Sequence, residues 1–351
     1  MNGMILAAGR GERMRPLTCR HAKPALTVLN RPLLSHAMEL LHRGGVQRVA
    51  VNLHHLPETV EQVVKDWAPQ GMEITFFREE EILGTAGGLK NAESMLQDGP
   101  FLVCNGDFLL QMDPADALQT HRESGAIVTL VVVPHRKHLS YTPVWVEDGK
   151  VLGFGEPPSG ETARGTRYIF AGLHVIEPSV LERIPGNKEW GIVRPVYSEL
   201  LAEGAHIAAH LAPGAWLEFG APSDYLRRSL RLLDESHRSF VKEMGIEVTG
   251  EEEELLVLGT DVHISDGASF VGLSVLGDGA AVGKGSRVER CIVGRGSVVS
   301  FGSELSDCIL ADGIILPPDT RLDHRIIMSR GDDLSDIPGG IRMDELVHFP
   351  L

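Results

Sequence analysis

Five basic side chains follow a short apolar segment near the start of the chain. Residues 4–8 are apolar, and two glycines, Gly9 and Gly11, come directly after them. The basic residues of this stretch are Arg10, Arg13, Arg15, Arg20 and Lys23. The whole chain, by contrast, carries a formal net charge of -15 at pH 7. Because glycine lets a backbone approach a bound group, and loop N–H groups with Arg and Lys bind phosphate, the segment is a candidate site for the phosphates of a nucleotide.

Two familiar phosphate-binding loops do not account for this segment. A Walker A loop needs Lys and then Ser or Thr directly after its last glycine, and the chain contains no such string. The dinucleotide-binding fingerprint needs a third glycine for close packing of helix and strand, but Met14 occupies that position. The remaining alternative is a surface loop with scattered arginines.

A second candidate for chemistry is an acidic residue that follows another apolar segment. Residues 101–104 are apolar and run into Asn105, Gly106 and Asp107. Mg²⁺ prefers one or two carboxylates together with phosphate oxygens and water. Asp107 is therefore either a metal ligand at the end of a strand or a residue that caps a turn.

Segments typical of strands and helices alternate in the first part of the chain, and they must position both groups. Strands are expected at 4–8, 46–53, 72–78, 101–104 and 126–133, and helices at 33–43, 57–68, 89–96 and 114–123. This alternation predicts an α/β fold with a mostly parallel, doubly wound sheet. Ligands of such sheets lie beyond the carboxyl ends of the strands, where both Gly9 and Asp107 fall.

The pattern changes after residue 142. Asp148-Gly149 between residues 144–146 and 151–154 predicts a hairpin, and strands at 168–176 and 215–219 would complete an antiparallel extension. Residues 223–243 are expected to form one amphipathic helix, capped by Ser223 and ended by Gly245. The acidic residues 251–254 are interpreted as a solvated linker. We therefore expect one domain at 1–245 and another at 246–351.

The second domain contains an internal repeat. Apolar residues lie six positions apart and resume this spacing after a slip of one residue: Ile264, Phe270, Leu276, Val282, Val288, then Val293, Val299 and Leu305. This period, with glycines at the turns, predicts a left-handed parallel β-helix of hexapeptide repeats, with about three coils over residues 264–322. The alternative is a glycine-rich β-meander, and residues 332–351 are either a tail or a contact segment.

The N-terminal segment resembles the signature of the sugar-1-phosphate nucleotidyltransferases, which is close to LAAGxGxRMxPLTxxxPKP. The chain has Leu6-Ala7-Ala8-Gly9, Gly11, Arg13-Met14, Pro16-Leu17-Thr18 and Lys23-Pro24, with Ala22 where the family usually has proline. The resemblance implies an enzyme that joins an NTP and a sugar 1-phosphate into an NDP-sugar and releases pyrophosphate. It also implies that Leu6, Ala7, Ala8, Gly9 and Gly11 contact the nucleotide, while Arg13 and Lys23 hold its triphosphate.

Other strings extend this resemblance. Gly84, Thr85 and Ala86 begin a segment that is similar to the family's base- and ribose-binding GTAGxL string. Asp107 matches the family's Mg²⁺ ligand, and Glu218 stands where the motif W-x-D-x-GTP has its aspartate. Asn105, Glu156 and Gly172 correspond to sugar-binding positions, although Pro157 and Phe170 replace the family's lysine and asparagine beside two of them. The implied catalytic residues are Arg13, Lys23 and Asp107, with Mg²⁺ as the cofactor.

Several functions stay open within this resemblance. A nucleotidyltransferase domain with a β-helix is most similar to the mannose-1-phosphate guanylyltransferase-like group, but uridylyl or thymidylyl transfer to another sugar 1-phosphate is an alternative. A bifunctional enzyme whose β-helix acetylates an amino sugar would need more coils than the repeat provides. A non-catalytic nucleotide-sugar-binding regulatory subunit is the third alternative, and the presence of Arg13, Lys23 and Asp107 counts against it.

Composition narrows the choice of partners and location. The acidic balance argues against nucleic-acid binding, and no apolar run has the length of a membrane span. The four cysteines lack paired or metal-type spacing, and no signal-peptide pattern begins the chain. We expect a cytoplasmic homo-oligomer with free cysteines that binds neither nucleic acid nor membranes.

Overall fold

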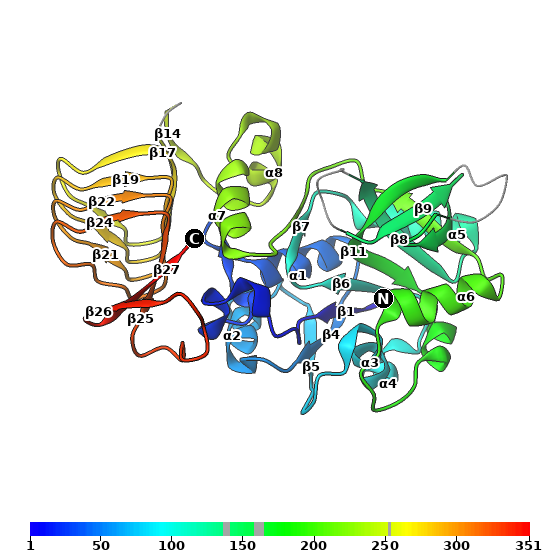
Figure 1. Cartoon of the computed structure of the whole chain (residues 1–351). Helices are drawn as coiled ribbons and strands as arrows, with labels where there is room; N and C mark the ends of the chain where they lie inside the picture. The colour runs from blue at the N-terminus through cyan, green and yellow to red at the C-terminus, as the bar shows by residue number, and fades with distance from the viewer. Residues whose placement is uncertain (136–140, 158–164, 252–253) are drawn as a thin grey trace. The chain divides into compact units, whose positions relative to one another are not determined.

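The computed structural model describes residues 1–135, 141–157, 165–251 and 254–351 (Figure 1). These residues form two compact units. Unit 1 comprises Met1–Arg10, Lys23–Ala25 and Leu33–Glu218, and unit 2 comprises Gly11–Ala22, Leu26–Pro32 and Phe219–Leu351. Two short N-terminal segments therefore belong to the same unit as the C-terminal part of the chain. The continuous part of unit 2 begins upstream of the boundary that we expected near residue 245.

A nine-stranded sheet forms the centre of unit 1, in the order β5-β4-β1-β6-β11-β8-β12-β10-β9. The strands are β1 (Asn2–Leu6), β4 (Arg48–Leu53), β5 (Glu73–Arg78), β6 (Phe101–Asn105), β8 (Val128–Pro134), β9 (Pro143–Glu147), β10 (Lys150–Phe154), β11 (Thr166–Ile176) and β12 (Ile207–Leu211). β11 and β10 run opposite to the other seven strands. Seven strands therefore point the same way, but only four of the eight neighbouring pairs are parallel, so the sheet is mixed rather than mostly parallel as predicted. The antiparallel strand β11 lies inside the sheet, between β6 and β8, rather than forming only an extension at its edge.

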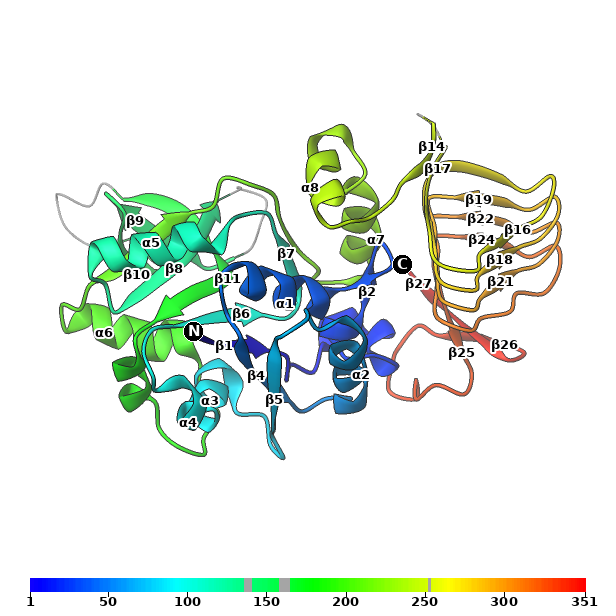
Figure 2. The ribbon, with the colours of Figure 1, turned by 180° about the vertical axis from the view of Figure 1, so that it is seen from behind.

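Helices cover both faces of this sheet, which follows from the alternation of side chains along each strand. A Cβ placed on Gly3 of β1 would meet Leu41 of α1 (Leu33–Arg43), whereas the next residue, Met4, packs with Leu89 of α3 (Gly84–Asn91). α5 (Pro114–Ser124) packs on the face of α1, and α4 (Glu93–Leu96) on the face of α3 (Figure 2). Unit 1 is therefore doubly wound.

The remaining elements of unit 1 are short. β7 (Phe108–Leu110) and β13 (Trp216–Glu218) form a separate antiparallel pair. The helices are α2 (Pro57–Trp67), α6 (Ser198–Ala202), the 3-10 helices η3 (Lys23–Ala25) and η4 (Pro178–Arg183), and the π-helix η5 (Ile192–Tyr197). Among the described residues of the whole chain, no helix is long and apolar enough to cross a bilayer.

The helix predicted at 223–243 is wrong in two respects. It is divided into α7 (Pro222–Arg231), the turn η6 (Glu235–His237) and α8 (Arg238–Glu243). Asp and Ser favour turns over helix interiors because they bind nearby backbone groups, and the His237 N–H donates to the Asp234 carbonyl at 2.9 Å. Ser223 is not the cap, since α7 begins with Pro222 after Ala221. Gly245, with φ at +68°, does follow the last turn, as predicted.

The acidic stretch at 251–254 is not simply a linker. β14 (Thr249–Glu251) pairs in antiparallel fashion with β15 (Glu254–Leu258), so residues at both ends of the stretch belong to a hairpin. Residues 252–253 lie outside the described part of the chain. β15 in turn pairs with β17 (Ser269–Leu276) because its apolar residues continue the repeat upstream.

Parallel pairing in three short sheets gives unit 2 the arrangement of a β-helix. Leu255 pairs with Leu273, Ala281 with Val298 and Glu304 with Arg321, so that the offset is first 18 and then 17 residues. The strands, yellow to red in Figure 1, are β15, β16 (His263–Ile264), β17, β18 (Ala281–Val282), β19 (Arg287–Glu289), β20 (Ile292–Val293), β21 (Val298–Val299), β22 (Glu304–Ser306), β23 (Ile309–Leu310), β24 (Arg321–Asp323) and β25 (Arg325–Ser329). These form four coils over residues 254–329, more than the three expected over 264–322, and they exclude the meander. The left hand of the helix stays a prediction.

The inward positions follow the predicted period with one exception. Residues such as Leu276, Val282 and Val299 are almost fully buried, as expected. Ile264 is 41% exposed, because it lies in the first coil, where only one neighbouring coil covers it. The predicted inward orientation is therefore wrong at that end.

The slip of one residue recurs at one corner of every later coil. Arg290, Asp307 and His324 lie above one another at this corner, each with φ near +50°, and Gly272 occupies the same corner in the coil before them. A non-glycine residue in this conformation costs about 1 kcal/mol. The corner side chains offset this cost by bonding to one another, as described below.

Residues 332–351 are not a free tail. β27 (Leu346–Pro350) pairs in antiparallel fashion with β25 on the last coil, and β26 (Ile341–Met343) pairs with β27. The N-terminal segments of unit 2 contain the turns η1 (Glu12–Met14) and η2 (Leu17–Cys19) and the hairpin β2 (Thr27–Val28) and β3 (Arg31–Pro32). All four cysteines lie in described segments and are free, as expected.

Candidate nucleotide-binding site

The loop after β1 leaves open space over its backbone. Leu6 ends the strand, Ala7 and Ala8 are buried, and Gly9 is exposed. A Cβ placed on Gly9 would have no described atom within 4 Å. Packing within the described residues therefore does not require glycine there, and the open backbone is suited to the close approach of a ligand.

A buried polar network that sequence reasoning missed supports this loop. The Asn52 side chain accepts a hydrogen bond from the Ala7 N–H at 2.7 Å and donates one to Glu79 at 2.7 Å. The other carboxylate oxygen of Glu79 accepts from the Leu83 N–H at 2.9 Å. Since Asn52 and Glu79 are both buried, the network joins the loop after β1 to the segment before α3. An asparagine that interrupts the apolar segment 49–53 was the available signal.

The predicted base-binding residues Gly84, Thr85 and Ala86 begin α3, but their small size has another cause. A Cβ on Gly84 would lie 2.8 Å from the Trp190 carbonyl oxygen, and the Ala86 N–H donates to that oxygen at 2.8 Å. The Thr85 hydroxyl accepts from the Ile192 N–H at 2.9 Å. The small residues thus allow residues 190–192 to pack on the start of the helix, so packing within the protein, and not only the approach of a bound base, accounts for their size.

Lys23 of η3 forms an ion pair with Asp107, which lies two residues after the end of β6. The Lys23 Nζ lies 2.6 Å from Oδ2 of Asp107. The lysine side chain is 9% exposed and the aspartate side chain 30% exposed. A nearly buried ammonium needs such a partner, because desolvation of an unpaired charge is costly. Gly106 brings the two groups together, since its N–H donates to the Leu6 carbonyl at 2.9 Å and a Cβ there would crowd that oxygen.

The second predicted carboxylate lies beside the first. Glu218 of β13 pairs in register with Phe108 of β7, the residue that follows Asp107. The Trp216 indole N–H donates to the Ala171 carbonyl at 2.9 Å, which joins β13 to β11. The pairing therefore brings the backbone of Glu218 next to the residue that follows Asp107, and a shared metal site for the two carboxylates stays a prediction.

Two of the three predicted sugar-binding residues are neighbours. A Cβ on Gly172, which has φ at +92°, would lie 3.0 Å from Nδ2 of Asn105. Glu156 is exposed on the loop after β10, and within the described residues no hydrogen bond or ion pair joins it to Asn105 or Gly172. The structure thus brings together Asn105, Asp107, Gly172 and Glu218, but not Glu156.

Gly11 and Arg13 belong to unit 2 and are described within it. Gly11 has φ at +64° and precedes the turn η1, and its carbonyl accepts from the Thr18 hydroxyl at 2.9 Å. Arg13 is exposed, and a Cβ on Gly220 would lie 3.7 Å from its Nη1. Residues 11–22 therefore form a compact turn within unit 2 that holds the Arg13 guanidinium near Gly220.

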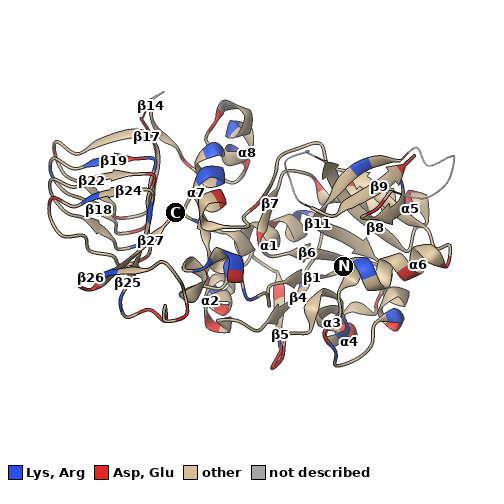
Figure 3. Cartoon of the chain, viewed as in Figure 1, with Lys and Arg blue, Asp and Glu red and all other residues tan. Residues whose placement is uncertain are grey.

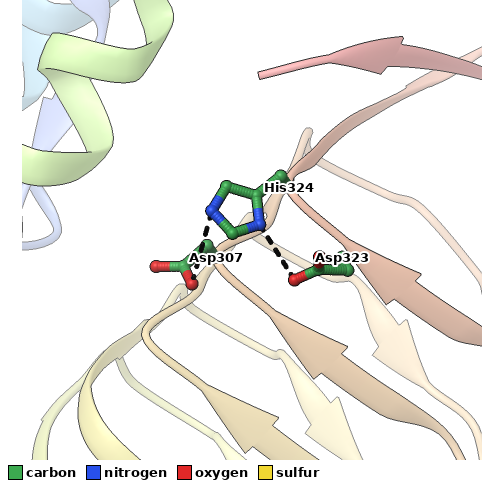
Figure 4. A group of neighbouring side chains, drawn as sticks. All are labelled: Asp307, Asp323 and His324. Carbon is green, nitrogen blue, oxygen red and sulfur yellow. Dashed lines mark hydrogen bonds and ion pairs between the residues drawn. The ribbon is translucent and has the colours of Figure 1, made fainter.

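A group of metal-ligating residue types at the β-helix corner is better explained by an ion-pair ladder (Figure 4). His324 lies 2.9 Å from Asp323 and 3.9 Å from Asp307. Nε of Arg290 donates to Asp307 at 2.9 Å, and this hydrogen bond with the guanidinium lowers the pKa of the Asp307 carboxyl. The arginine already supplies the positive charge that an ion would bring, so the ladder stabilises the stacked corner instead.

A cavity of about 800 Å³ within unit 2 borders the same corner. Arginines of α7 and α8 line it together with leucines. The ribbon of both helices carries blue segments, which mark Lys and Arg, in Figure 3. Three of its four arginines are already in ion pairs: Arg227 with Asp224, Arg231 with Asp234 and Arg290 with Asp307. Its positive charge is therefore mostly balanced by the protein itself.

Known proteins are similar to this chain in sequence and in fold. The family described as "Nucleotidyl transferase" matches residues 2–235. UTP–glucose-1-phosphate uridylyltransferase of Synechocystis sp. is 32% identical, over 83% of this chain and 82% of that protein. Mannose-1-phosphate guanylyltransferase of Mycobacterium tuberculosis is also 32% identical, over 83% of this chain and 79% of that protein. The crystal structure of HddC from Yersinia pseudotuberculosis complexed with GMP-PN has a TM-score of 0.54 at 23% identity, over 68% of this chain and 99% of that one, which shows the fold alone.

The chain belongs to the nucleotidyl transferase family.

Proposed function

We propose that this chain is a sugar-1-phosphate nucleotidyltransferase, which joins an NTP and a sugar 1-phosphate into an NDP-sugar and releases pyrophosphate. The observation that carries the proposal is the Lys23–Asp107 ion pair, which lies after the end of β6, next to the loop of Leu6 and the open backbone of Gly9. The similarity to curated sugar-1-phosphate nucleotidyltransferases over more than four fifths of the chain agrees with it.

The chain's own groups fit the charges of this reaction. The attacking atom is a phosphate oxygen, so no protein base is required, and positioning with charge neutralisation supplies the catalysis. Lys23 neutralises Asp107 in the described structure, and a triphosphate would offer its ammonium a second anionic partner. Arg13 is proposed to act on the same triphosphate, and Leu6, Ala7, Ala8, Gly9, Gly11, Gly84, Thr85 and Ala86 to contact the nucleotide.

Asp107 and Glu218 fit a Mg²⁺ site. Glu218 lies on β13, Asp107 directly precedes the paired strand β7, and the Asp107 side chain is 30% exposed, which leaves room for phosphate and water ligands. Bound Mg²⁺ would neutralise phosphate charge. The protein's part is to hold both carboxylates at the strand ends, which the tight approach of Gly106 to Leu6 secures.

For the substrates, we propose GTP and mannose 1-phosphate first. Relatives named for guanylyl and uridylyl transfer are equally similar, so UTP or TTP with another hexose 1-phosphate is the alternative. Asn105 and Gly172 are proposed sugar contacts because they adjoin Asp107. Phe170 packs on His174 at 5.1 Å between ring centres, and it cannot replace the hydrogen bonds of the family's asparagine.

The decisive experiment measures pyrophosphate release with a panel of NTPs and sugar 1-phosphates. We expect turnover with at least one pair, and loss of turnover in EDTA and in Asp107→Asn. Asp98→Asn is the matched control, since Asp98 is exposed and belongs to unit 1. Nucleotide binding without any pyrophosphate release would favour the regulatory subunit instead.

We further propose a cytoplasmic location and a homo-oligomer. Exposed apolar side chains on the β-helix, such as Phe301 at 57% and Ile315 at 66%, support assembly.

A further inference from the structure

Carboxylates near the end of the β-helix in unit 2 bind residues 11–22, the part of the N-terminal signature that belongs to the same unit. Within unit 2, Nε of Arg20 lies 3.3 Å from Asp332, and Nε2 of His21 lies 3.3 Å from Asp312. Arg20 also donates through Nη1 to the carbonyl of Asp312. Asp312 lies in the turn after β23, and Asp332 follows β25. The anchors therefore come from the last coil and from the segment that leaves it.

These contacts are partly shielded from solvent, so they are stronger than ordinary surface pairs. The side chain of Asp332 is 12% exposed and that of Arg20 30% exposed. Burial opposes ionisation of Asp312, but the hydrogen bond and charge of His21, together with Arg295, outweigh it and lower the pKa of this carboxyl. A third pair, Arg15 with Asp336, is more exposed and adds less.

A second N-terminal segment is held by the same unit. Nδ2 of Asn30 donates to the Leu276 carbonyl at 2.8 Å, and Arg31 donates to the Met244 carbonyl. Tyr225 of α7 donates its hydroxyl hydrogen to the Thr27 carbonyl. The chain returns to unit 1 only at Lys23–Ala25 between the two held segments. Lys23 thus has an anchored segment on either side of it in the chain.

We infer that the β-helix positions the triphosphate-binding residues, with Asp312 and Asp332 as positioning residues for Arg13 and Lys23. This inference rests on the proposed function. Catalysis by charge contact requires preorganised cations, and a segment released from its anchors loses part of that preorganisation. The aspartates act through Arg20 and His21 rather than by touching the substrate.

The chain offers a matched control. Asn at either position removes the charge but keeps an acceptor for the local turn: Asp312 accepts from the Arg295 N–H at 2.9 Å, and Asp332 from the Ser329 N–H at 2.9 Å. Asp278 occupies the position of Asp312 two coils earlier and accepts from the Thr260 N–H at 2.7 Å. Asp278→Asn therefore repeats the change in the β-helix at a residue that, within the described part of the chain, has no hydrogen bond or ion pair with residues 11–22.

The full-length double variant D312N/D332N should show a rise of about 10-fold in KM for the NTP and a fall in kcat, with KM for the sugar 1-phosphate unchanged. Asp278→Asn should match the parent. Arg20→Gln removes the ion pair with Asp332 and the hydrogen bond to the Asp312 carbonyl without altering the β-helix, and it leaves the His21–Asp312 pair in place. It should show the same changes in KM and kcat to a smaller extent, even if the double variant folds poorly.

Cys19 provides a readout that needs no turnover. It is half-buried in the anchored segment, whereas Cys104, Cys291 and Cys308 are buried. Release of the segment should raise the rate of Cys19 alkylation by iodoacetamide about 10-fold in the double variant, and to a smaller extent in Arg20→Gln, because exposure and thiolate content both increase. An unchanged alkylation rate would overturn the inference whatever the activity.

A raised alkylation rate with parent values of KM and kcat would equally overturn it, because the anchors would then be structural only. If the parent releases no pyrophosphate, the proposed function fails by itself. The dissociation constant of the NTP then replaces KM as the measure of positioning, and an equal constant in parent and variants contradicts the inference.

Discussion

The Lys23–Asp107 pair is the residue-scale feature on which the proposed reaction depends. The nearly buried Lys23 ammonium is neutralised by the partly exposed Asp107 carboxylate, so replacement of either residue leaves the other charge unpaired and also changes the charge offered to the substrate. We expect Lys23→Ala to lower kcat/KM by about 100-fold, comparable to the loss of one preorganised charge contact. Steady-state kinetics would check this, with the exposed Lys65→Ala as the control. Near-parent kinetics in Lys23→Ala would remove the lysine from the mechanism.

Arg13→Ala should lower kcat/KM by a similar factor of about 100, through the same triphosphate. Arg13 lies in the compact turn between Gly11 and Thr18, and its exposure means that stability should change by no more than about 0.5 kcal/mol. Thermal unfolding beside kinetics separates the two effects. A fall in kcat/KM accompanied by a clear fall in the unfolding temperature would argue that Arg13 has a structural role.

Substitutions of Glu218 test the proposed metal site, because glutamate and aspartate differ by only one methylene group. Glu218→Asp restores the residue that the resembling motif has, and should keep Mg²⁺-dependent turnover. Glu218→Ala should raise the Mg²⁺ concentration needed for half-maximal activity by about 10-fold, because one of two carboxylates is lost. If the alanine variant has the parent's Mg²⁺ dependence, Glu218 is not a ligand.

At the scale of elements, the network of Asn52 and Glu79 joins two loops that sequence reasoning treated separately. Asn52→Leu would leave the Ala7 N–H and a buried Glu79 oxygen without partners. We expect a loss of about 3 kcal/mol in the free energy of unfolding and a raised KM for the NTP. Urea unfolding would measure the first effect. Asn91→Leu on the exposed end of α3 is the control, and a loss no greater than in that control would contradict a supporting role.

A buried histidine of β11 makes stability depend on pH. Burial lowers the pKa of His174 to about 3, and the Tyr197 hydroxyl lies 2.6 Å from its Nδ1. Below pH 6.5 the unfolded chain binds a proton that the folded chain does not, so stability is full above that pH and falls as pH drops toward 3. This group should account for a loss of about 3 kcal/mol between pH 7 and pH 4.5. Urea unfolding across this range should show a flatter dependence in His174→Gln; an identical slope would contradict the assignment.

Local patterns in the sequence predicted most helices and strands, but not the features that depend on contacts between distant residues. α1 and the hairpin at Asp148-Gly149 have the expected place, because apolar periodicity and turn residues act over a few positions. The insertion of β11 between β6 and β8 depends on long-range pairing, which has no local signal. The corner residue Arg290 was visible only as a slip, since its left-handed backbone depends on the ladder to Asp307.

The candidate site was predictable where a motif is contiguous and not where the fold assembles it. The strings around Gly9 and Asp107 pointed to the strand ends that the structure brings together. Asn52 and Glu79 belong to no such string, and only their burial and mutual bond reveal them. The anchoring of Arg20 by Asp332, more than three hundred positions away, requires the coordinates of the last coil.

At the scale of the whole molecule, one face of the β-helix is a candidate for self-assembly. Ala281, Val298 and Ile315 lie above one another in the sheet of β16, β18 and β21. Ile315 is 66% exposed, and neither it nor Val298 is among the buried residues that form the core. A row of exposed apolar side chains on a flat face is typical of a contact between two identical subunits. Such a contact would bury the row while removing few polar groups from water.

We therefore expect the full chain to exceed its monomer mass of 38.2 kDa in solution, and the double variant V298K/I315K to return to that mass. Lysines at outward positions should leave each coil folded but place like charges opposite one another across a symmetric contact. Ile341→Lys on β26, where the side chain is 59% exposed, is the control for added charge. Light scattering at several concentrations would measure the mass. A parent that is already monomeric, or a double variant that keeps the parent's mass, would show that this face does not assemble the protein.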